Sequence, residues 1–300
     1  MRSLIRLLAL TAVLLLPACS RQPVTDPDYV AEIDRWHQGR IERLESDTGW
    51  LTLVGLHELH AGVNSLGAAE GNDVRLIAKA PPRVGKLEVG ELGVVFQAAP
   101  EARVTLFDST ATSVGGMLLD TDRSGRPTRL ACGSLVFYVI DRQGRLFLRV
   151  KDRESEILRS FTGIDRFPVD ARWRVTARLE GQPGQVAIEN VLGQKVSEPS
   201  PGKLVFRLEG KVCRVSPTGE PGGGLSLIFA DPTNGQTTYP AGRFLEIDPP
   251  DSSGIYTVDF NKAYNPPCCF TPFATCPLPP PENTLPVAVT AGEKMWGHGH

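Results

Sequence analysis

Acidic, basic and amide side chains that could form a site are concentrated in the second half of the chain. Asp231 lies in a turn-like DPTNG segment, and Arg243 follows in a strand-like run. An arginine that is drawn toward a β-rich core needs a carboxylate partner or an anionic ligand. We therefore expect Arg243 to meet Asp152 or Asp259, the two carboxylates that we consider as its partners.

A pocket for a small polar ligand is the site that these residue types suggest. Its expected members are Lys151, Asp152, Arg243, Asp259, Asn261 and Tyr264. Asp259 and Asn261 alternate with Phe260, so on a strand both polar side chains project to one face. The same residues also fit a buried ion-pair network that holds two β units together. Both interpretations remain open at the level of the sequence.

Catalytic motifs with a known mechanism are missing from the chain. It holds no G-x-S-x-G, H-E-x-x-H, P-loop or G-x-G-x-x-G sequence. We predict neither a bound metal nor a cofactor, because the sequence shows no further ligands to accompany His57 and His60. The hydrolase that we consider would use Asp231 and Asp259 as its acid and base.

Prolines, cysteines and aromatic residues are packed into residues 259–287. The PLPPPEN sequence there is typical of a stiff, extended strap. Cys269 and Cys276 are our candidates for a disulfide, and Cys268 with Cys276 is the alternative. A small loop closed in this way stabilises a fold by about 2–3 kcal/mol. We interpret the bridge as a structural clamp rather than a redox couple, because C-x-x-C chemistry is absent.

The pattern of apolar residues predicts a mainly β protein with one N-terminal amphipathic helix. Asp26 and Pro27 are typical of a helix N-cap and first helical residue, and we expect the helix to end near Thr48 and Gly49. Short alternating and β-branched runs follow from Trp50 onward. The DRQG sequence (Asp141 to Gly144) between two of these runs predicts a hairpin turn. We predict an antiparallel sandwich or open barrel in two packed units. The expected ranges are 26–163 for the helix with the first β unit, 164–296 for the second β unit with the Pro/Cys-rich strap, and 297–300 for a tail.

The first twenty residues have the character of an export signal. Arg2 and Arg6 precede an apolar run that is too short to span a bilayer comfortably. We therefore predict a signal peptide at residues 1–18 and an oxidising destination for the rest of the chain.

A lipid anchor is expected directly after this signal. The Leu-Pro-Ala-Cys sequence that ends at Cys19 resembles the lipobox of bacterial lipoproteins, apart from its proline. The resemblance implies lipid on Cys19, a tether at 19–25 and attachment to a membrane. Ser20 stands where an inner-membrane retention signal would usually show Asp, which implies the outer membrane, facing the periplasm. A plain cleaved signal, with Cys19 removed or left as a free thiol, is the alternative.

The charge is balanced along the chain. Its 300 residues carry a net charge of -2, and no Lys/Arg-rich run stands out. This composition gives no sign of a nucleic-acid partner, and an anionic membrane surface is not an obvious partner either. Nothing in the sequence indicates the oligomeric state.

Six motifs are spread over the mature chain: GWLTLVGL, GVNSLG, LRVKDRES, FPVD, DPTNGQTTYPAGRFL and DFNKAYNPPCCFTPFATCPLPPPENTLPV. They resemble a widespread bacterial and archaeal family whose common name is domain of unknown function 1684. The resemblance extends from about Trp36 to Lys294, and the last two motifs are specific. It implies one folded unit and no particular activity.

The expected function is that of an envelope lipoprotein which binds a small polar ligand or a cell-wall fragment. The first alternative is the hydrolase with paired carboxylates. The second is a scaffold whose exposed sheet edges pair with another envelope protein.

Lipidation is directly testable. Cells grown with radiolabelled palmitate should label the wild-type chain and not the Cys19→Ala variant, because the acyl chains attach to that cysteine. The measurement is fluorography of the immunoprecipitated protein, with a known lipoprotein as the positive control. A wild-type chain that stays unlabelled while the control takes up label would contradict the anchor.

Overall fold

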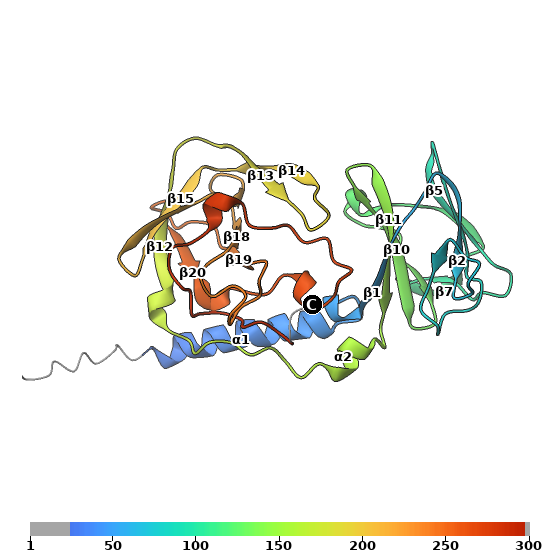
Figure 1. The fold of residues 1–300 in the computed structure, drawn as a ribbon, viewed down its shortest axis with the longest axis horizontal. Coiled ribbons are helices and arrows are strands. Elements are labelled where there is room, and N and C mark those ends of the chain that lie inside the picture. Colours follow the sequence, from blue (N-terminus) through green and yellow to red (C-terminus); the bar gives the residue numbers. More distant parts are fainter. Residues whose placement is uncertain (1–24, 298–300) are drawn as a thin grey trace, which may run out of the picture.

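The structure, a computed structural model, describes residues 25–297, apart from the side chains of residues 110–112. The predicted signal peptide, the predicted lipidation site at Cys19, the predicted tether up to residue 24 and tail residues 298–300 lie outside the described residues. Two β units lie side by side, and helix α1 (Pro27–Glu45) runs along the second unit toward the first (Figure 1). Within residues 25–297, no helix is long and apolar enough to cross a membrane.

The first β unit consists of two sheets packed around one apolar core. A six-stranded sheet has the order β1-β11-β10-β9-β6-β7, with β1 (Leu53–Glu58), β6 (Thr105–Leu106), β7 (Ser109–Ser113), β9 (Leu130–Cys132), β10 (Leu135–Arg142) and β11 (Arg145–Asp152). A five-stranded sheet has the order β3-β2-β4-β5-β8, with β2 (Gly62–Gly67), β3 (Val74–Arg75), β4 (Gly85–Gly90), β5 (Gly93–Ala98) and β8 (Gly116–Leu119). Only β2 and β3 pair in parallel among these described strands.

The hairpin of β10 and β11 gives the six-stranded sheet two unlike faces. Its turn is the predicted DRQG sequence, in which Gln143 and Gly144 have φ values of 58° and 82°, the left-handed pair that a tight hairpin favours. One face is apolar and joins the core through Phe137, Val139, Leu148 and Val150. The opposite face carries Tyr138, Arg149 and Lys151, because side chains alternate along a strand.

The second β unit contains three smaller antiparallel sheets. The four-stranded sheet has the order β16-β15-β12-β20, with β12 (Arg174–Glu180), β15 (Lys203–Leu208), β16 (Lys211–Val215) and β20 (Tyr256–Asp259). The others are β17-β18-β19 and β13-β14, with β13 (Gly184–Glu189), β14 (Lys195–Ser200), β17 (Thr218–Gly219), β18 (Leu225–Phe229) and β19 (Arg243–Ile247). A second core lies among them and includes Leu285, Val287 and Val289 of the C-terminal segment. The described chain is therefore mainly β and contains no closed barrel.

Helix α1 begins as predicted, with Asp26 as N-cap and Pro27 at the first position. It ends at Glu45 rather than near residue 48. We grouped this helix with the first β unit, but its polar contacts are with the second. The Tyr29 hydroxyl donates to Asp259 at 2.8 Å, and Lys262 pairs with Glu32 at 2.8 Å.

A buried ionic contact holds the middle of α1 on the second unit. The Arg40 guanidinium lies 4.7 Å from the centre of the Tyr264 ring, and its Nη2 donates to the carbonyl of Asn265 at 2.9 Å. Arg40 Nε is 3.5 Å from the carboxylate of Glu293, which also accepts from the backbone N–H of Asn265 at 2.7 Å. Burial raises the pKa of Glu293, and the charge of Arg40 opposes that effect.

The proline- and cysteine-rich strap joins the two units. It is anchored to the first unit by Thr271 Oγ1, which donates to the carbonyl of Leu53 at 3.0 Å. It is anchored to the second unit by the backbone N–H of Val191, which donates to the Cys276 carbonyl at 3.0 Å. A third apolar cluster forms here from the end of α1, the start of β1 and the strap, with Leu44, Leu51, Leu53, Phe161, Cys269 and Phe270 among its members.

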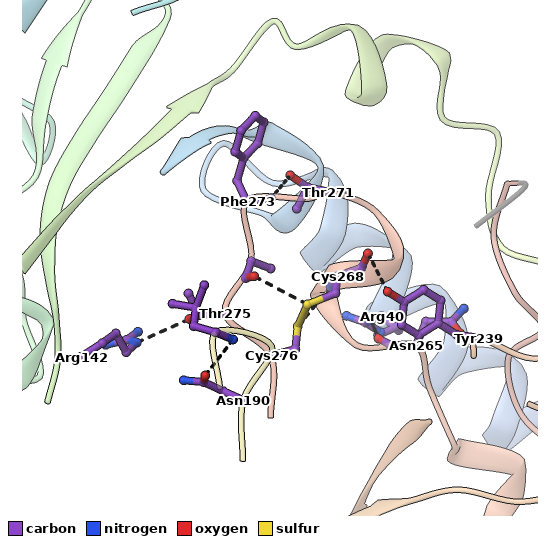
Figure 2. Close-up of a disulfide and its surroundings, with 12 residues drawn as sticks. Arg40, Arg142, Asn190, Tyr239, Asn265, Cys268, Thr271, Phe273, Thr275 and Cys276 are labelled. Carbon is purple, nitrogen blue, oxygen red and sulfur yellow. Dashed lines mark hydrogen bonds between the residues drawn. A yellow bond between two sulfur atoms is a disulfide. The ribbon is translucent and has the colours of Figure 1, made fainter. Parts of the chain in front are cut away.

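The disulfide in the strap joins Cys268 to Cys276 (Figure 2). The pairing of Cys269 with Cys276 is therefore wrong, and the alternative is the one present. A 3-10 turn, η5 (Pro267–Cys269), contains both neighbouring cysteines and directs their side chains apart. Cys269 Sγ lies 3.9 Å from the carbonyl of Trp296 instead, and burial raises its pKa to about 12. The structure thus favours a structural clamp over a redox couple, because Cys269, the third cysteine of the strap, is a buried thiol.

Thiol counting tests this pairing. In the denatured, unreduced protein, Cys132, Cys213 and Cys269 should react with iodoacetamide, and Cys268 and Cys276 should react only after reduction. Fragment-ion mass spectrometry locates the adducts. Cys269→Ser should leave the bridge intact, whereas Cys268→Ser should free Cys276. Adducts on Cys268 before reduction would show that the clamp is absent.

Candidate functional site

A polar hollow opens on the outer face of the six-stranded sheet, beside the segment that follows α1. We call it the basic pocket. Its volume is 680 Å³. Its lining consists of Thr48, Asp108, Asp122, Gly125, Arg126, Pro127, Arg129, Tyr138, Arg149 and Lys151. Four of these side chains are cationic and two are carboxylates, so positive charge prevails in the pocket.

Arg149 on β11 is a buried cation without an acidic partner. It is 6% exposed, and its guanidinium lies 5.2 Å from the centre of the Trp50 ring and 6.0 Å from that of Tyr138. No hydrogen bond or ion pair reaches its side chain from the described residues, and its Nε is buried without a partner. Burying an unpaired charge is costly. An anion in the pocket would offset that cost.

Lys151 lies two residues further along β11, on the same face. It is 5% exposed and donates to the carbonyls of Thr48 and Gly49. Burial, together with the charges of Arg149 and Arg129, lowers the pKa of Lys151 to about 8. Its ammonium group is therefore a cation at neutral pH that loses its proton on mild alkalinisation.

The two carboxylates of the pocket are already neutralised. Asp108 pairs with Arg129. Asp122 pairs at 2.6 Å with Arg142, which lies beside the pocket. The guanidinium of Arg126 is exposed at the rim and has no partner among the described residues. Three cations, Arg126, Arg149 and Lys151, are left without a carboxylate.

The geometry of the pocket suits an anion. Arg149 and Lys151 supply charged donors in a partly desolvated setting, where such hydrogen bonds are strong. The hydroxyl of Tyr138, directly across the β10–β11 pair from Arg149, has no partner among the described residues and adds a neutral donor. Because guanidinium is planar, Arg149 can bind a carboxylate or phosphate through two parallel hydrogen bonds.

The structure separates the six residues that we expected in one pocket. Lys151 lies in the basic pocket, whereas the neighbouring Asp152 points to the other side of β11 and pairs with Lys79 at 2.6 Å. Burial works against the charged form of Asp152, but hydrogen bonds from Lys79 and Ser134 outweigh it and lower its pKa.

Arg243 meets neither Asp152 nor Asp259, so both expected pairings are wrong. Its guanidinium is 0% exposed and pairs with Asp231 at 2.8 Å. It also donates to the carbonyls of Val289, at 2.9 Å, and Ala291. Burial lowers the pKa of Arg243, and the charge of Asp231 opposes this effect. These contacts correspond to the structural network rather than to an open site.

Asp259 and Asn261 converge, but not as neighbours on a strand. Asp259 ends β20, and Asn261 lies in the following turn, η4 (Phe260–Lys262). Asp259 accepts from the Asn261 backbone N–H at 3.0 Å and from the hydroxyl of Tyr29. Tyr264 lies elsewhere, and its hydroxyl donates to Glu246 at 3.0 Å. Asp231 and Asp259 are therefore held by different partners, which gives no support to an acid–base pair.

Arg149, Tyr138 and Arg126 are donors of the basic pocket that our sequence analysis missed. The signal was the alternation in RLFLRVKD, which places Arg149 and Lys151 on one face of a strand whose other face is apolar. A metal is not suggested by the structure: residues 25–297 contain no group of three or more His, Cys, Asp or Glu side chains arranged to hold one.

Replacement of Arg149 separates a binding role from a structural one. Without ligand, Arg149→Met should raise the free energy of unfolding by about 1 kcal/mol or more, because an unpaired buried charge is removed. Urea denaturation at an unchanged m-value measures this change. The control is Arg145→Met on the same strand, where the lost ion pair with Glu58 is exposed and the change should stay within about 0.5 kcal/mol. A destabilised Arg149→Met would mean that the Trp50 and Tyr138 contacts make Arg149 structural.

Comparison with known proteins concerns mainly the second β unit. Residues 159–294 match the family described as Protein of unknown function (DUF1684). An uncharacterised protein of Haloarcula marismortui, known from a solution NMR structure, is 33% identical; the match covers 46% of this chain and 80% of that one, with a TM-score of 0.38. No curated protein matches the chain. The chain belongs to the DUF1684 family of proteins of unknown function, through the segment 159–294.

Proposed function

We propose that this protein is a lipid-anchored binding protein of the cell envelope, which takes a small anionic ligand in the basic pocket. The observation that carries the proposal is the buried guanidinium of Arg149, which lines the pocket and has no partner among the described residues. A paired or exposed arginine would need no ligand. An unpaired buried one is the feature that a bound carboxylate or phosphate would explain.

The chemistry of the pocket narrows the ligand class. A hollow of 680 Å³ is in the range of small-molecule sites. Its donors are Arg149, Lys151 and the Tyr138 hydroxyl at the sheet, with Arg126 at the rim. The ring of Trp50 is already occupied by the two cations, at 5.2 Å from Arg149 and 5.4 Å from Lys151. The ligand is therefore polar and anionic rather than hydrophobic, and an acidic cell-wall fragment fits this description.

The location follows from the N-terminal sequence. An export signal followed by a lipid on Cys19 would hold the chain at the outer membrane, facing the periplasm. The tether of residues 19–25 would then lead directly into α1, which carries the chain along the second unit to the basic pocket. A ligand-binding protein at that place would meet cell-wall fragments in solution.

Sulfate is a probe for this site because its charge stays constant from neutral to alkaline pH. We expect sulfate to bind with little pH dependence below pH 8. Above it, affinity should fall by up to about tenfold per pH unit as Lys151 deprotonates, since binding then requires uptake of one proton. Isothermal titration calorimetry at several pH values measures this slope.

Two variants make the test specific. Lys151→Gln should bind more weakly and lose the slope above pH 8, and Arg149→Gln should lose at least about tenfold in affinity. Arg75→Gln, which changes an exposed arginine of the other sheet, should bind as the wild type does. Sulfate, phosphate and sugar acids that all fail to bind, or binding that Arg149→Gln leaves intact, would refute the proposal.

A further inference from the structure

A second basic surface lies at the opposite end of the molecule, on the four-stranded sheet of the second unit. Its inner face packs on the core through Ala177, Leu204 and Phe206. Its outer face forms a shallow hollow of 730 Å³, which we call the arginine face. Residues that line it include Arg174, Arg178, Arg207, Arg214, Glu180 and Val212.

Positive charge on the arginine face is largely uncompensated. Glu180 is the one acid among the described residues that line it, and it lies 3.7 Å from Arg214. Arg178 has no ion pair or side-chain hydrogen bond with the described part of the chain, and Arg207 reaches only the carbonyl of Gly210 at 3.4 Å. Val212, 41% exposed, supplies apolar surface between the arginines. Arginines interleaved with small apolar side chains suit a surface of anionic lipid headgroups.

The start of α1 lies on this same face of the sheet. Arg174 is paired across the strands with Asp259, so both side chains leave the sheet on one side. Tyr29, in the first turn of α1, donates to Asp259, and its ring lies 5.0 Å beneath the Arg174 guanidinium. In Figure 1, α1 begins at the end of the molecule where β12 and β15 lie. The described chain therefore begins beside the arginines.

The length of the tether keeps this face near the bilayer. Eight peptide steps separate Cys19 from Pro27, the first residue of α1, and even a fully extended chain of that length spans at most about 25–30 Å. Acidic residues near the start of α1 offset the arginines only in part. Glu32 is paired with Lys262, which leaves the exposed Asp26 and Asp28 as acids without an ion pair to the described residues.

We infer that the arginine face docks on anionic lipid headgroups of the membrane that holds the anchor. The anchor would supply attachment, and the sheet would supply orientation, with the second unit against the bilayer and the basic pocket turned away from it. This inference uses the proposed lipid on Cys19 but does not depend on the ligand of the basic pocket.

Fluorescence quenching tests the docking. A fluorophore is attached through Thr176→Cys, an exposed position of β12 on the arginine face, and separately through Leu92→Cys, which is 88% exposed on the β4–β5 turn of the other unit. The native free cysteines are buried and do not compete for the label. The full-length protein, held by its anchor, is placed in phosphatidylcholine vesicles that contain a headgroup quencher, with or without phosphatidylglycerol.

We expect several-fold stronger quenching at position 176 when phosphatidylglycerol is present, an effect that salt weakens, and little change at position 92. Replacing Arg174, Arg178, Arg207 and Arg214 by glutamine should abolish the effect, and replacing them by lysine should retain it. Unchanged far-UV circular dichroism would show that both variants fold. Equal quenching in the two kinds of vesicle would overturn the inference.

A failed anchor is recognised separately. If the chain carries no lipid, flotation of the same variants with phosphatidylglycerol vesicles tests the sheet alone. Flotation that is lost when the four arginines are replaced by glutamine would support the docking surface. Flotation that persists in the glutamine variant, or no flotation of the wild type, would overturn it.

Discussion

The buried ionic contacts of α1 determine the arrangement of the whole molecule. The buried ion pair of Arg40 and Glu293 fixes the helix to the C-terminal segment. The hydrogen bond from Tyr29 to Asp259 fixes the first turn of the helix to the four-stranded sheet. A buried pair is strongly destabilised when one member is removed, because the other charge is left uncompensated. The helix therefore has one position, with its start at the arginine face and its end near the basic pocket.

Three buried arginines illustrate how differently the fold treats the same side chain. Arg243 is compensated by Asp231 and two backbone carbonyls, and Arg40 is compensated by Glu293 and the carbonyl of Asn265. Both belong to segments that must be held together. Arg149 has aromatic neighbours but no anionic partner among the described residues, so no ion pair within the described chain balances its charge. This contrast is the physical basis for placing the site at Arg149.

Residue patterns along the sequence correctly predicted much of the local structure of the chain. The helix start, the β-rich character and the DRQG hairpin turn depend on residues close in the chain, and the structure contains all three. Which carboxylate pairs with a given arginine depends on how the strands are ordered in space, and no local sequence pattern determines that order. Arg243 was therefore assigned the wrong carboxylates, although Asp231 lies only twelve residues away. The neighbouring Cys268 and Cys269 are almost equally close to Cys276 in sequence, and only the turn that contains them selects one.

The distribution of charge also shows that the linear sequence does not reveal which side chains meet in space. A net charge of -2 without a basic run argued against an anionic surface as partner, yet sheet formation gathers cations that are far apart in the chain. The arginine face takes its residues from β12, β15 and β16, and the basic pocket takes its cations from β11 and from the loop before β9. Because alternation sends every second side chain of a strand to one face, one arginine at every second position on adjacent strands suffices to build a cationic surface. The absence of a Lys/Arg-rich run therefore excludes a long basic segment, but neither that absence nor the net charge excludes a basic face.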